Sequence, residues 1–332
     1  MTQEVEIAGQ SFTRRGATTA LLRAAESRVE DARRLSGLEV REIYLNLVIA
    51  EREVTLADTA ARFAGRLADF ALRQFDAGEI NRLEVNVAVL DAARARSAAE
   101  RAHAAAAGAA ADLARVLAVP PDSTVRSTAL PPLPEVGWDS LAALLPLALA
   151  RRPDLHATAA ELAGATKELS AARRGVIPNL TVAAVGGQEG GTDDLLGVQL
   201  GIQVPLFYRG QAARGAAEAD LATARATRAA TERAIQAELV AGVARFRRFT
   251  SAERQFAREV LRAADENVSL TEQALAEGEV DLTEVILLRR TALDAQREYL
   301  AVLADAYTAW FELAATLNVA PLELTPLLTG KN

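Results

Sequence analysis

The stretch "FDAGEINRLEV", residues 75–85, recurs 200 residues later as "LAEGEVDLTEV", residues 275–285. The two copies align without gaps, so that Gly78 corresponds to Gly278 and Glu84 corresponds to Glu284. The correspondence continues to the ends of the following segments, "LAVPP" at residues 117–121 and "LNVAP" at residues 317–321. Self-similarity at a fixed offset is typical of a duplicated structural unit. The sequence therefore predicts two copies of one unit.

Apolar residues recur at alternating steps of three and four on both sides of the first turn. Before the turn they are Val40, Ile43, Leu47, Ala50, Val54, Ala57, Ala61, Ala64, Ala68, Ala71 and Phe75. After it they are Val85, Ala88, Ala92, Ala95, Ala99, Ala102, Ala106, Ala109, Leu113 and Val116. These heptad spacings predict knobs-into-holes packing between helices. Each copy of the repeat is therefore predicted to be an antiparallel helical hairpin. Gly78 and Gly278 are expected to permit a left-handed turn between the helices.

The expected helices are long. At a rise of 1.5 Å per residue, a helix over residues 17–75 measures roughly 87 Å and one over residues 212–276 roughly 96 Å. Such rods exceed the diameter of a domain, and two hairpins form a wall only if other copies of the chain complete it. The expected segments are a remnant of a β-hairpin (1–16), the first helical hairpin (17–118), a proline-rich linker (119–150), a helix opening the second repeat (151–178), a β-hairpin (179–207), the second helical hairpin (208–320) and a tail (321–332).

Composition excludes several classes of function. Of the 332 residues 50% are hydrophobic but only 5% aromatic, and the net charge of −7 argues against a nucleic-acid partner. The chain has no cysteine, and its two histidines, His103 and His156, lie on unrelated expected helices. The sequence contains neither a Ser-His-Asp arrangement nor a nucleotide-binding fingerprint. We therefore expect no enzyme, no cofactor and no bound metal.

Two short segments alternate as strands do. "NLTVAAVGGQ" (residues 179–188) and "LGVQLGIQV" (residues 196–204) are each about as long as a tilted strand that crosses a bilayer. The second segment has its apolar residues on one face, which predicts a membrane-facing surface formed by Val198, Leu200, Ile202 and Val204. An amphipathic hairpin on a soluble sheet fits the periodicity equally well. However, two strands alone are marginal, and open edges do not occur in lipid, so other strands must complete this sheet.

Together these segments resemble the TolC-type outer-membrane efflux family. The similar motifs are "RRPDL" (151–155), "IPNL" (177–180), "PLFYRGQ" (205–211) and the Gly-Glu turns at Gly78 and Gly278. "QEVEIAGQ" (3–10) is similar to the branch linked to cobalt, zinc and cadmium export. The resemblance extends over essentially the whole chain.

The resemblance implies a mainly α fold with a membrane β-hairpin. In this family a homotrimer shares a β-barrel, to which each subunit gives four strands, and an α-barrel tunnel continues from the outer membrane into the periplasm. Substrate passes without catalysis, driven by an inner-membrane RND pump joined through a periplasmic adaptor. This chain has one complete β-hairpin, and Val5 and Ile7 resemble the tail of another. Roughly fifty residues and a signal peptide are therefore expected upstream of Met1.

The resemblance also singles out the turns of the helical hairpins. It implies that Glu84 and Glu284 constrict the tunnel as rings of carboxylates, which would attract cations. Polar links between subunits and adaptor docking are expected around the same turns, at Gly78, Glu79, Arg82, Gly278, Glu279 and Asp281. The alternative is that both glutamates are solvated helix-start residues stabilised by the positive end of the helix. A doubled acidic ring is doubtful because the positions one turn later, such as Val87 and Leu287, are apolar.

Two other functions are alternatives to that of an outer-membrane exit duct, which is the channel of a tripartite efflux system. A periplasmic adaptor also contains helical hairpins, but it normally surrounds one hairpin with mirrored β-rich segments, whereas this chain has two tandem hairpins. A soluble coiled-coil scaffold gives the alternating strands no role and predicts no partition into a membrane.

Overall fold

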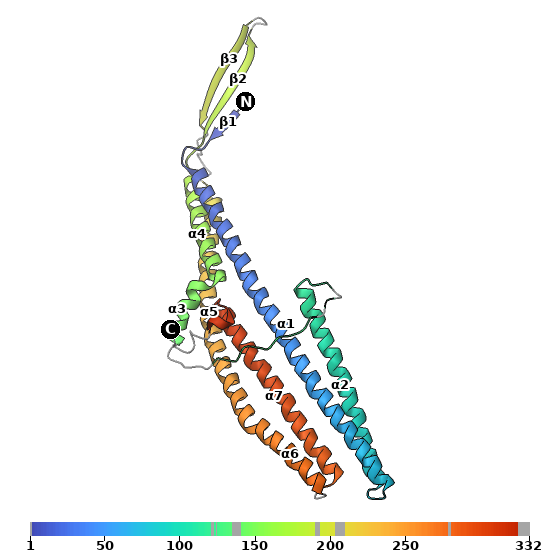
Figure 1. The fold of residues 1–332 in the computed structure, drawn as a ribbon. Coiled ribbons are helices and arrows are strands. Elements are labelled where there is room, and N and C mark those ends of the chain that lie inside the picture. Colours follow the sequence, from blue (N-terminus) through green and yellow to red (C-terminus); the bar gives the residue numbers. More distant parts are fainter. Residues whose placement is uncertain are drawn as a thin grey trace. The chain divides into compact units, whose positions relative to one another are not determined.

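The computed structural model describes residues 2–120, 123, 125–134, 141–189, 193–202, 210–277 and 280–324. The helices are α1 (Gln10–Asp76), α2 (Arg82–Val116), α3 (Leu141–Arg151), α4 (Pro153–Arg174), α5 (Gln211–Phe256), α6 (Arg262–Glu277) and α7 (Leu282–Thr316), with a π-helical segment, Ala257–Leu261, between α5 and α6 (Figure 1). The strands are β1 (Thr2–Val5), β2 (Leu180–Glu189) and β3 (Asp193–Ile202). None of the described helices is long and apolar enough to cross a membrane.

The chain divides into two compact units. The strand unit comprises Met1–Arg33 and Leu145–Glu238, and the hairpin unit comprises Arg34–Leu144 and Leu239–Asn332. Helix α1 is continuous and contributes its first residues to the strand unit and the rest to the hairpin unit.

The sheet of the strand unit is antiparallel, in the order β1-β2-β3. Leu200 pairs with Val182 and Gln199 pairs with Ala183, so apolar and polar residues of β3 lie on opposite faces, as predicted. On the apolar face Val198 is 76% exposed. The strands span residues 180–189 and 193–202 instead of the expected 179–188 and 196–204, and Val204 lies outside the described residues.

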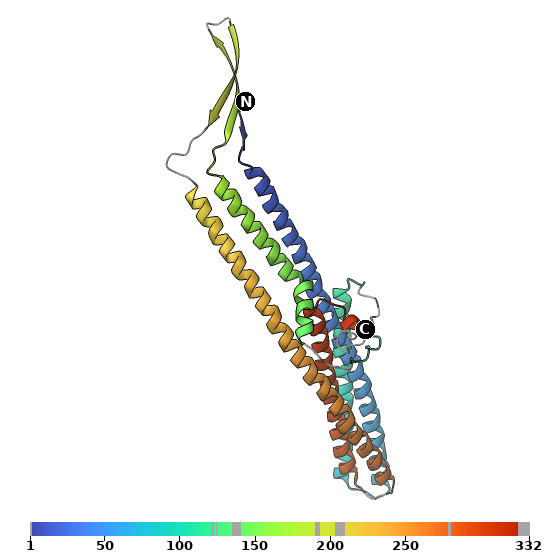
Figure 2. The same ribbon diagram turned by 90° about the vertical axis from the view of Figure 1, so that its left-hand side faces the viewer.

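Three helices pack side by side beneath the sheet in the strand unit (Figure 2). Helices α1 and α4 approach closely because small residues face one another: a Cβ added to Gly164 would lie 3.7 Å from both Ala17 O and Ala20 Cβ. Helices α4 and α5 pack through a cluster that includes Leu169 and Leu221. Small side chains at these positions allow the helices to pack closely.

The "RRPDL" motif forms a buried ionic junction between α4 and α5. Arg152 is 3% exposed, and its guanidinium binds both carboxylate oxygens of Asp154, at 2.9 and 2.6 Å, and Glu238 Oε2 at 2.7 Å. Burial alone lowers the pKa of Arg152, but the hydrogen bonds to Asp154 and Glu238 outweigh it and raise the pKa above its usual value. Pro153 occupies the first turn of α4, where its missing N–H is not needed. The motif therefore fixes the start of one helix against the side of another.

The heptad pattern of the first helical hairpin is confirmed. Ala57 on α1 packs with Ala99 and Ala102 on α2, and every predicted seam position on these two helices is buried or half-buried. In the second hairpin, α7 is the most apolar helix, with Trp310 fully buried and stacked on Phe311.

Helices α2 and α7 end in the same way, 200 residues apart. The amide of Val119 donates to Ala114 O at 3.0 Å, and the amide of Val319 donates to Ala314 O at 3.0 Å. The residues that turn the chain are Ala118 (φ +51°) and Asn318 (φ +50°), both in the left-handed conformation. The sequence repeat is thus also a repeat of backbone structure.

Four features differ from the sequence-based expectation. Helix α1 begins at Gln10, before the expected Ala17, and helix α3 occupies part of the segment expected to be a linker. The helix expected to be continuous over residues 212–276 contains the π-helical segment. The helix expected to run toward Pro178 ends at Arg174, because Gly175 and the residues before Pro178 cannot extend it favourably.

Candidate functional site

The first helical hairpin turns through a glycine-dependent cap. Gly78 has a φ of +76°, its amide donates to Phe75 O at 2.9 Å, and the amide of Glu79 donates to Gln74 O at 2.9 Å. This is the Schellman arrangement, which satisfies the last carbonyls of α1. An added Cβ at Gly78 would meet no atom, so the requirement for glycine is conformational. Gly278 and Glu279 lie outside the described residues.

Both glutamates singled out by the sequence lie in the first turn of a helix. Asn81 Oδ1 accepts hydrogen bonds from the amides of Leu83 and Glu84, and Asn81 Nδ2 donates to Glu84 Oε1 at 2.6 Å. Asp281 Oδ1 accepts from the amide of Glu284 at 2.8 Å. Such N-caps stabilise helix starts, and the positive helix end favours the carboxylates. Glu84 is half-buried and Glu284 is exposed.

Arg82 fastens the start of α2 to the end of α1. Its guanidinium carbon lies 5.3 Å from the centroid of the Phe75 ring, within the range of a cation–π contact. Glu79 is exposed, and its backbone amide completes the cap of α1. The predicted tip residues therefore act first within their own hairpin, as caps and a ring contact.

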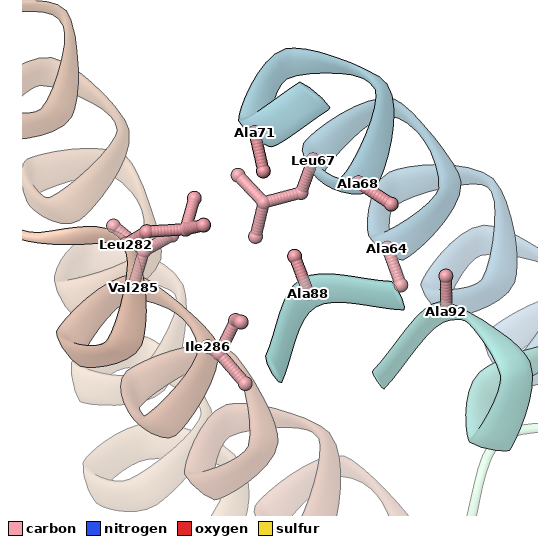
Figure 3. Packing of buried hydrophobic residues seen from close by; sticks show 9 residues of the cluster. All are labelled: Ala64, Leu67, Ala68, Ala71, Ala88, Ala92, Leu282, Val285 and Ile286. Atoms are coloured by element: carbon pink, nitrogen blue, oxygen red, sulfur yellow. The ribbon is translucent and has the colours of Figure 1, made fainter. Parts of the chain in front are cut away.

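The two helical hairpins meet in an apolar cluster near these turns (Figure 3). Its buried members come from α1, α2 and α7: Ala64, Leu67, Ala68, Ala71, Ala88, Ala92, Leu282, Val285 and Ile286. Val285 and Ala71 are fully buried. Each fully buried branched side chain contributes about 1.5–3 kcal/mol relative to exposure. The cluster thus holds the start of α7 against the first hairpin.

Arginines of α7 surround this cluster with polar contacts. Arg290 donates to Asp91 on α2, Arg297 donates to Glu53 on α1 at 2.9 Å, and Arg289 lies over the Phe63 ring at 3.9 Å. These residues, apart from Glu53, line a cavity of about 420 Å³ between the hairpins, together with Arg94 and Arg101 of α2. Such contacts resist separation of the hairpins yet remain accessible to water.

The structure gives no sign of a metal centre in the part it describes. No group of three His, Asp or Glu side chains there has the arrangement of a metal site. His103 Nε2 lies 3.0 Å from Asp58 Oδ1, which links α2 to α1, and His156 is exposed on α4.

Sequence reasoning identified the turns but missed the contacts between the hairpins. Asp91, Arg290 and Arg297 lie outside the heptad seams, and nothing in their spacing pairs residues some 200 apart. In the other copy of the repeat, Leu90 corresponds to Arg290 and Thr291 corresponds to Asp91, and both residues are uncharged. The sequence repeat therefore does not predict this ion pair.

The family model for "Outer membrane efflux protein" matches residues 144–319, a little over half of the chain. The chain belongs to the outer membrane efflux protein family. Members of this family are channels of the outer membrane and not enzymes. No curated protein sequence matches the chain.

Solved outer-membrane channels share the fold of this family member. The Campylobacter jejuni CmeC channel has a TM-score of 0.80 at 14% identity, with 99% of this chain and 73% of CmeC aligned. The Neisseria gonorrhoeae MtrE channel, in its open state, has a TM-score of 0.81 at 17% identity, covering 96% and 74%. CusC has a TM-score of 0.80 at 18% identity, covering 96% and 76%. The TolC-type fold expected from the sequence is confirmed.

Proposed function

We propose that this outer-membrane efflux channel is the exit duct of a tripartite RND-type system. Three copies would share one β-barrel in the outer membrane, continue as an α-helical tunnel into the periplasm, and meet a periplasmic adaptor and an inner-membrane pump. The observation that supports assembly is the three-stranded sheet: β1 and β3 are edge strands, and an edge cannot remain open in lipid. Strands from other segments or copies must close it.

Metal cations are the proposed substrate. The chain is acidic, with a net charge of −7, and each hairpin turn is followed by a glutamate, Glu84 or Glu284. Six carboxylates in a trimer would make the tunnel end attractive to cations and unattractive to anions. Passage requires no coordinating cluster, because a duct that bound its cargo tightly would release it slowly.

The alternatives are less well supported. A periplasmic adaptor is disfavoured by the family match and by the tandem hairpins, and a soluble scaffold gives no role to the apolar face of β3. Docking of the adaptor at the turns around Gly78 and Gly278 remains part of the proposal.

The test is conductance of the full chain in a planar bilayer under a gradient of KCl. We expect discrete channels that favour cations, and a reversal potential that moves toward zero in the double variant Glu84→Gln with Glu284→Gln. A matched control, Glu100→Gln with Glu298→Gln, removes two exposed charges from the same helices away from the turns. Absence of channel activity would contradict the proposed role as a duct. An equal change in the control would contradict the role of the turn carboxylates.

The substrate is tested separately in cells that lack their own exit duct. Expression of the chain together with a periplasmic adaptor and an RND pump of the cobalt, zinc and cadmium type should restore tolerance to these cations. Restored tolerance to organic toxins alone would contradict the metal assignment while leaving the duct in place.

A further inference from the structure

A basic cavity lies between α1 and α4 in the strand unit. It measures about 520 Å³, and its charged lining residues are Arg15 and Arg23 from α1 and Lys167 from α4. None of its described lining residues is acidic, and Thr13 and Thr19 also line it, with their hydroxyl groups donating to backbone carbonyls of α1. Three cationic side chains without an acidic neighbour on the described wall provide the charge-assisted donors that recognise a phosphate group.

The cavity lies where the strands give way to helices. Helix α1 begins at Gln10, a few residues after β1 ends at Val5, and α4 ends at Arg174, a few residues before β2 begins. Phe12, also on the cavity wall, is 80% exposed in the first turn of α1. An exposed aromatic ring beside basic side chains is typical of the boundary between the hydrocarbon and the headgroups of a bilayer.

The position of the lysine is set by a glycine. Lys167 Nζ donates to Gly16 O at 3.2 Å, and a Cβ added to Gly16 would lie 3.0 Å from both the Nζ and the Cδ of Lys167. An ammonium group has three donors, so this contact leaves two of them for another acceptor. A side chain at residue 16 would therefore push the end of the Lys167 side chain out of its present position.

Arg15 and Arg23 of the cavity differ from other arginines of α1 in their ion pairs. Arg14 of α1 forms an ion pair with Glu6, which precedes this helix, and Arg28 of α1 forms one with Glu161 of α4. In the described part of the chain, Arg15 and Arg23 form no ion pair. Within the described residues, the charge of these two arginines is therefore not neutralised by an ion pair.

We propose that this cavity binds the phosphate of an anionic phospholipid at the periplasmic edge of the outer membrane. The inference rests on the proposed function, because it needs the strands to lie in a bilayer. Free phosphate offers the same oxygens, but only a lipid also gives Phe12 an apolar partner. A bound headgroup would fix the depth at which the membrane strands give way to α1 and α4.

The experiment is native mass spectrometry of the detergent-solubilised full chain with dioleoylphosphatidylglycerol or dioleoylphosphatidylcholine. These lipids share their acyl chains and differ in net charge. The cavity variant is Arg15→Gln, Arg23→Gln and Lys167→Gln. Its control, Arg225→Gln, Arg228→Gln and Arg233→Gln, removes the same charge from exposed positions of α5 in the same unit. Gly16→Ala serves as a second variant, which moves Lys167 without changing the charge.

We expect the wild type to retain the anionic lipid preferentially, by about tenfold, as charge-assisted contacts to phosphate allow. The cavity variant should lose this preference, the control should keep it, and Gly16→Ala should weaken it. Equal retention of both lipids by the wild type, or equal loss in variant and control, would overturn the proposal. Displacement of the anionic lipid by inorganic phosphate would overturn the lipid as ligand in favour of free phosphate.

Flotation with vesicles separates this proposal from the proposed function. If the wild type floats with vesicles of either lipid but shows no preference in mass spectrometry, the membrane function stands and the lipid site fails. If it floats with neither, the proposed function fails, and the lipid site fails with it.

Discussion

Arg290 Nε on α7 donates a hydrogen bond to Oδ1 of Asp91 on α2 at 2.8 Å, and Arg290 Nη2 forms an ion pair with the same oxygen at 2.6 Å. The side chain of Asp91 is 18% exposed and that of Arg290 44%. The pair links the two copies of the repeat, yet the repeat itself does not contain it, because Leu90 and Thr291 occupy the equivalent positions. It therefore holds the second hairpin against the first and has no counterpart in the duplicated unit.

Loss of this ion pair should favour an open tunnel. A partly exposed pair contributes about 1 kcal/mol, which corresponds to about a fivefold change in an equilibrium between closed and open hairpins. Arg290→Gln and Asp91→Asn should each increase the open time in single-channel recordings. The charge swap Arg290→Asp with Asp91→Arg should restore the wild-type value. Arg115→Gln, which removes a looser exposed pair on α2, is the control. A swap that behaves like the single variants would contradict an electrostatic link.

The folded protein should be more stable with glycine in place of Ala118. Its φ of +51° costs a residue with a Cβ about 1–2 kcal/mol, whereas glycine adopts this conformation freely. Ala118→Gly should therefore raise the midpoint of thermal unfolding, followed by circular dichroism of the solubilised chain. Ala104→Gly, at an exposed position inside α2, should lower the midpoint, because glycine in a helix interior costs about 1 kcal/mol. A fall in the midpoint for both variants would show that Ala118 makes contacts that outweigh its strain.

The sequence predicts the periodic parts of this fold well. The seams of the first hairpin, the turn at Gly78 and the alternation of β3 each follow from a local rule about which side chains share a face. The same rules predicted that Glu84 and Glu284 lie at helix starts, and the caps from Asn81 and Asp281 explain why.

The features that the sequence did not predict depend on tertiary contacts. Helix α3 contains Pro146, which normally argues against a helix, yet burial of Ala148 and Leu144 compensates for the lost backbone hydrogen bond. The π-helical segment Ala257–Leu261 is an exception, because none of its residues is buried and nothing in its sequence predicts it. The ion pair of Arg290 and Asp91 joins residues whose proximity only the folded hairpins create.

Glu42 should limit stability at neutral pH. Burial raises the pKa of its carboxyl above the usual 4.5, and the charges of Glu312 and Glu39 raise it further. Because the folded pKa is the higher one, the associated stability is complete below the unfolded pKa and is lost as the pH rises through the folded pKa. Glu42→Gln should therefore raise the midpoint of thermal unfolding at pH 7. The gain in the free energy of unfolding should be less than about 1 kcal/mol, because Glu42 is partly exposed.

The same substitution should have little effect below pH 4, where Glu42 is protonated in both states. Thermal unfolding of the wild type and the variant at both values of pH measures this difference. Glu298→Gln, at an exposed position of α7, is the control. A benefit of equal size at both values of pH would mean that packing of the amide, and not the charge of Glu42, is responsible.

The two faces of β3 should respond oppositely to arginine. Val198 lies on the apolar face and Gln199 on the other, paired with Ala184 and Ala183 of β2. An arginine that faces lipid costs about 2–4 kcal/mol near the middle of a bilayer, whereas one that faces water costs little. Val198→Arg should therefore reduce flotation of the chain with phospholipid vesicles. Gln199→Arg should insert normally and lower the preference of the channel for cations, because it adds positive charge to the water-filled side. If both variants inserted equally well, the hairpin would not cross the membrane, and the apolar face would have to be covered by protein instead.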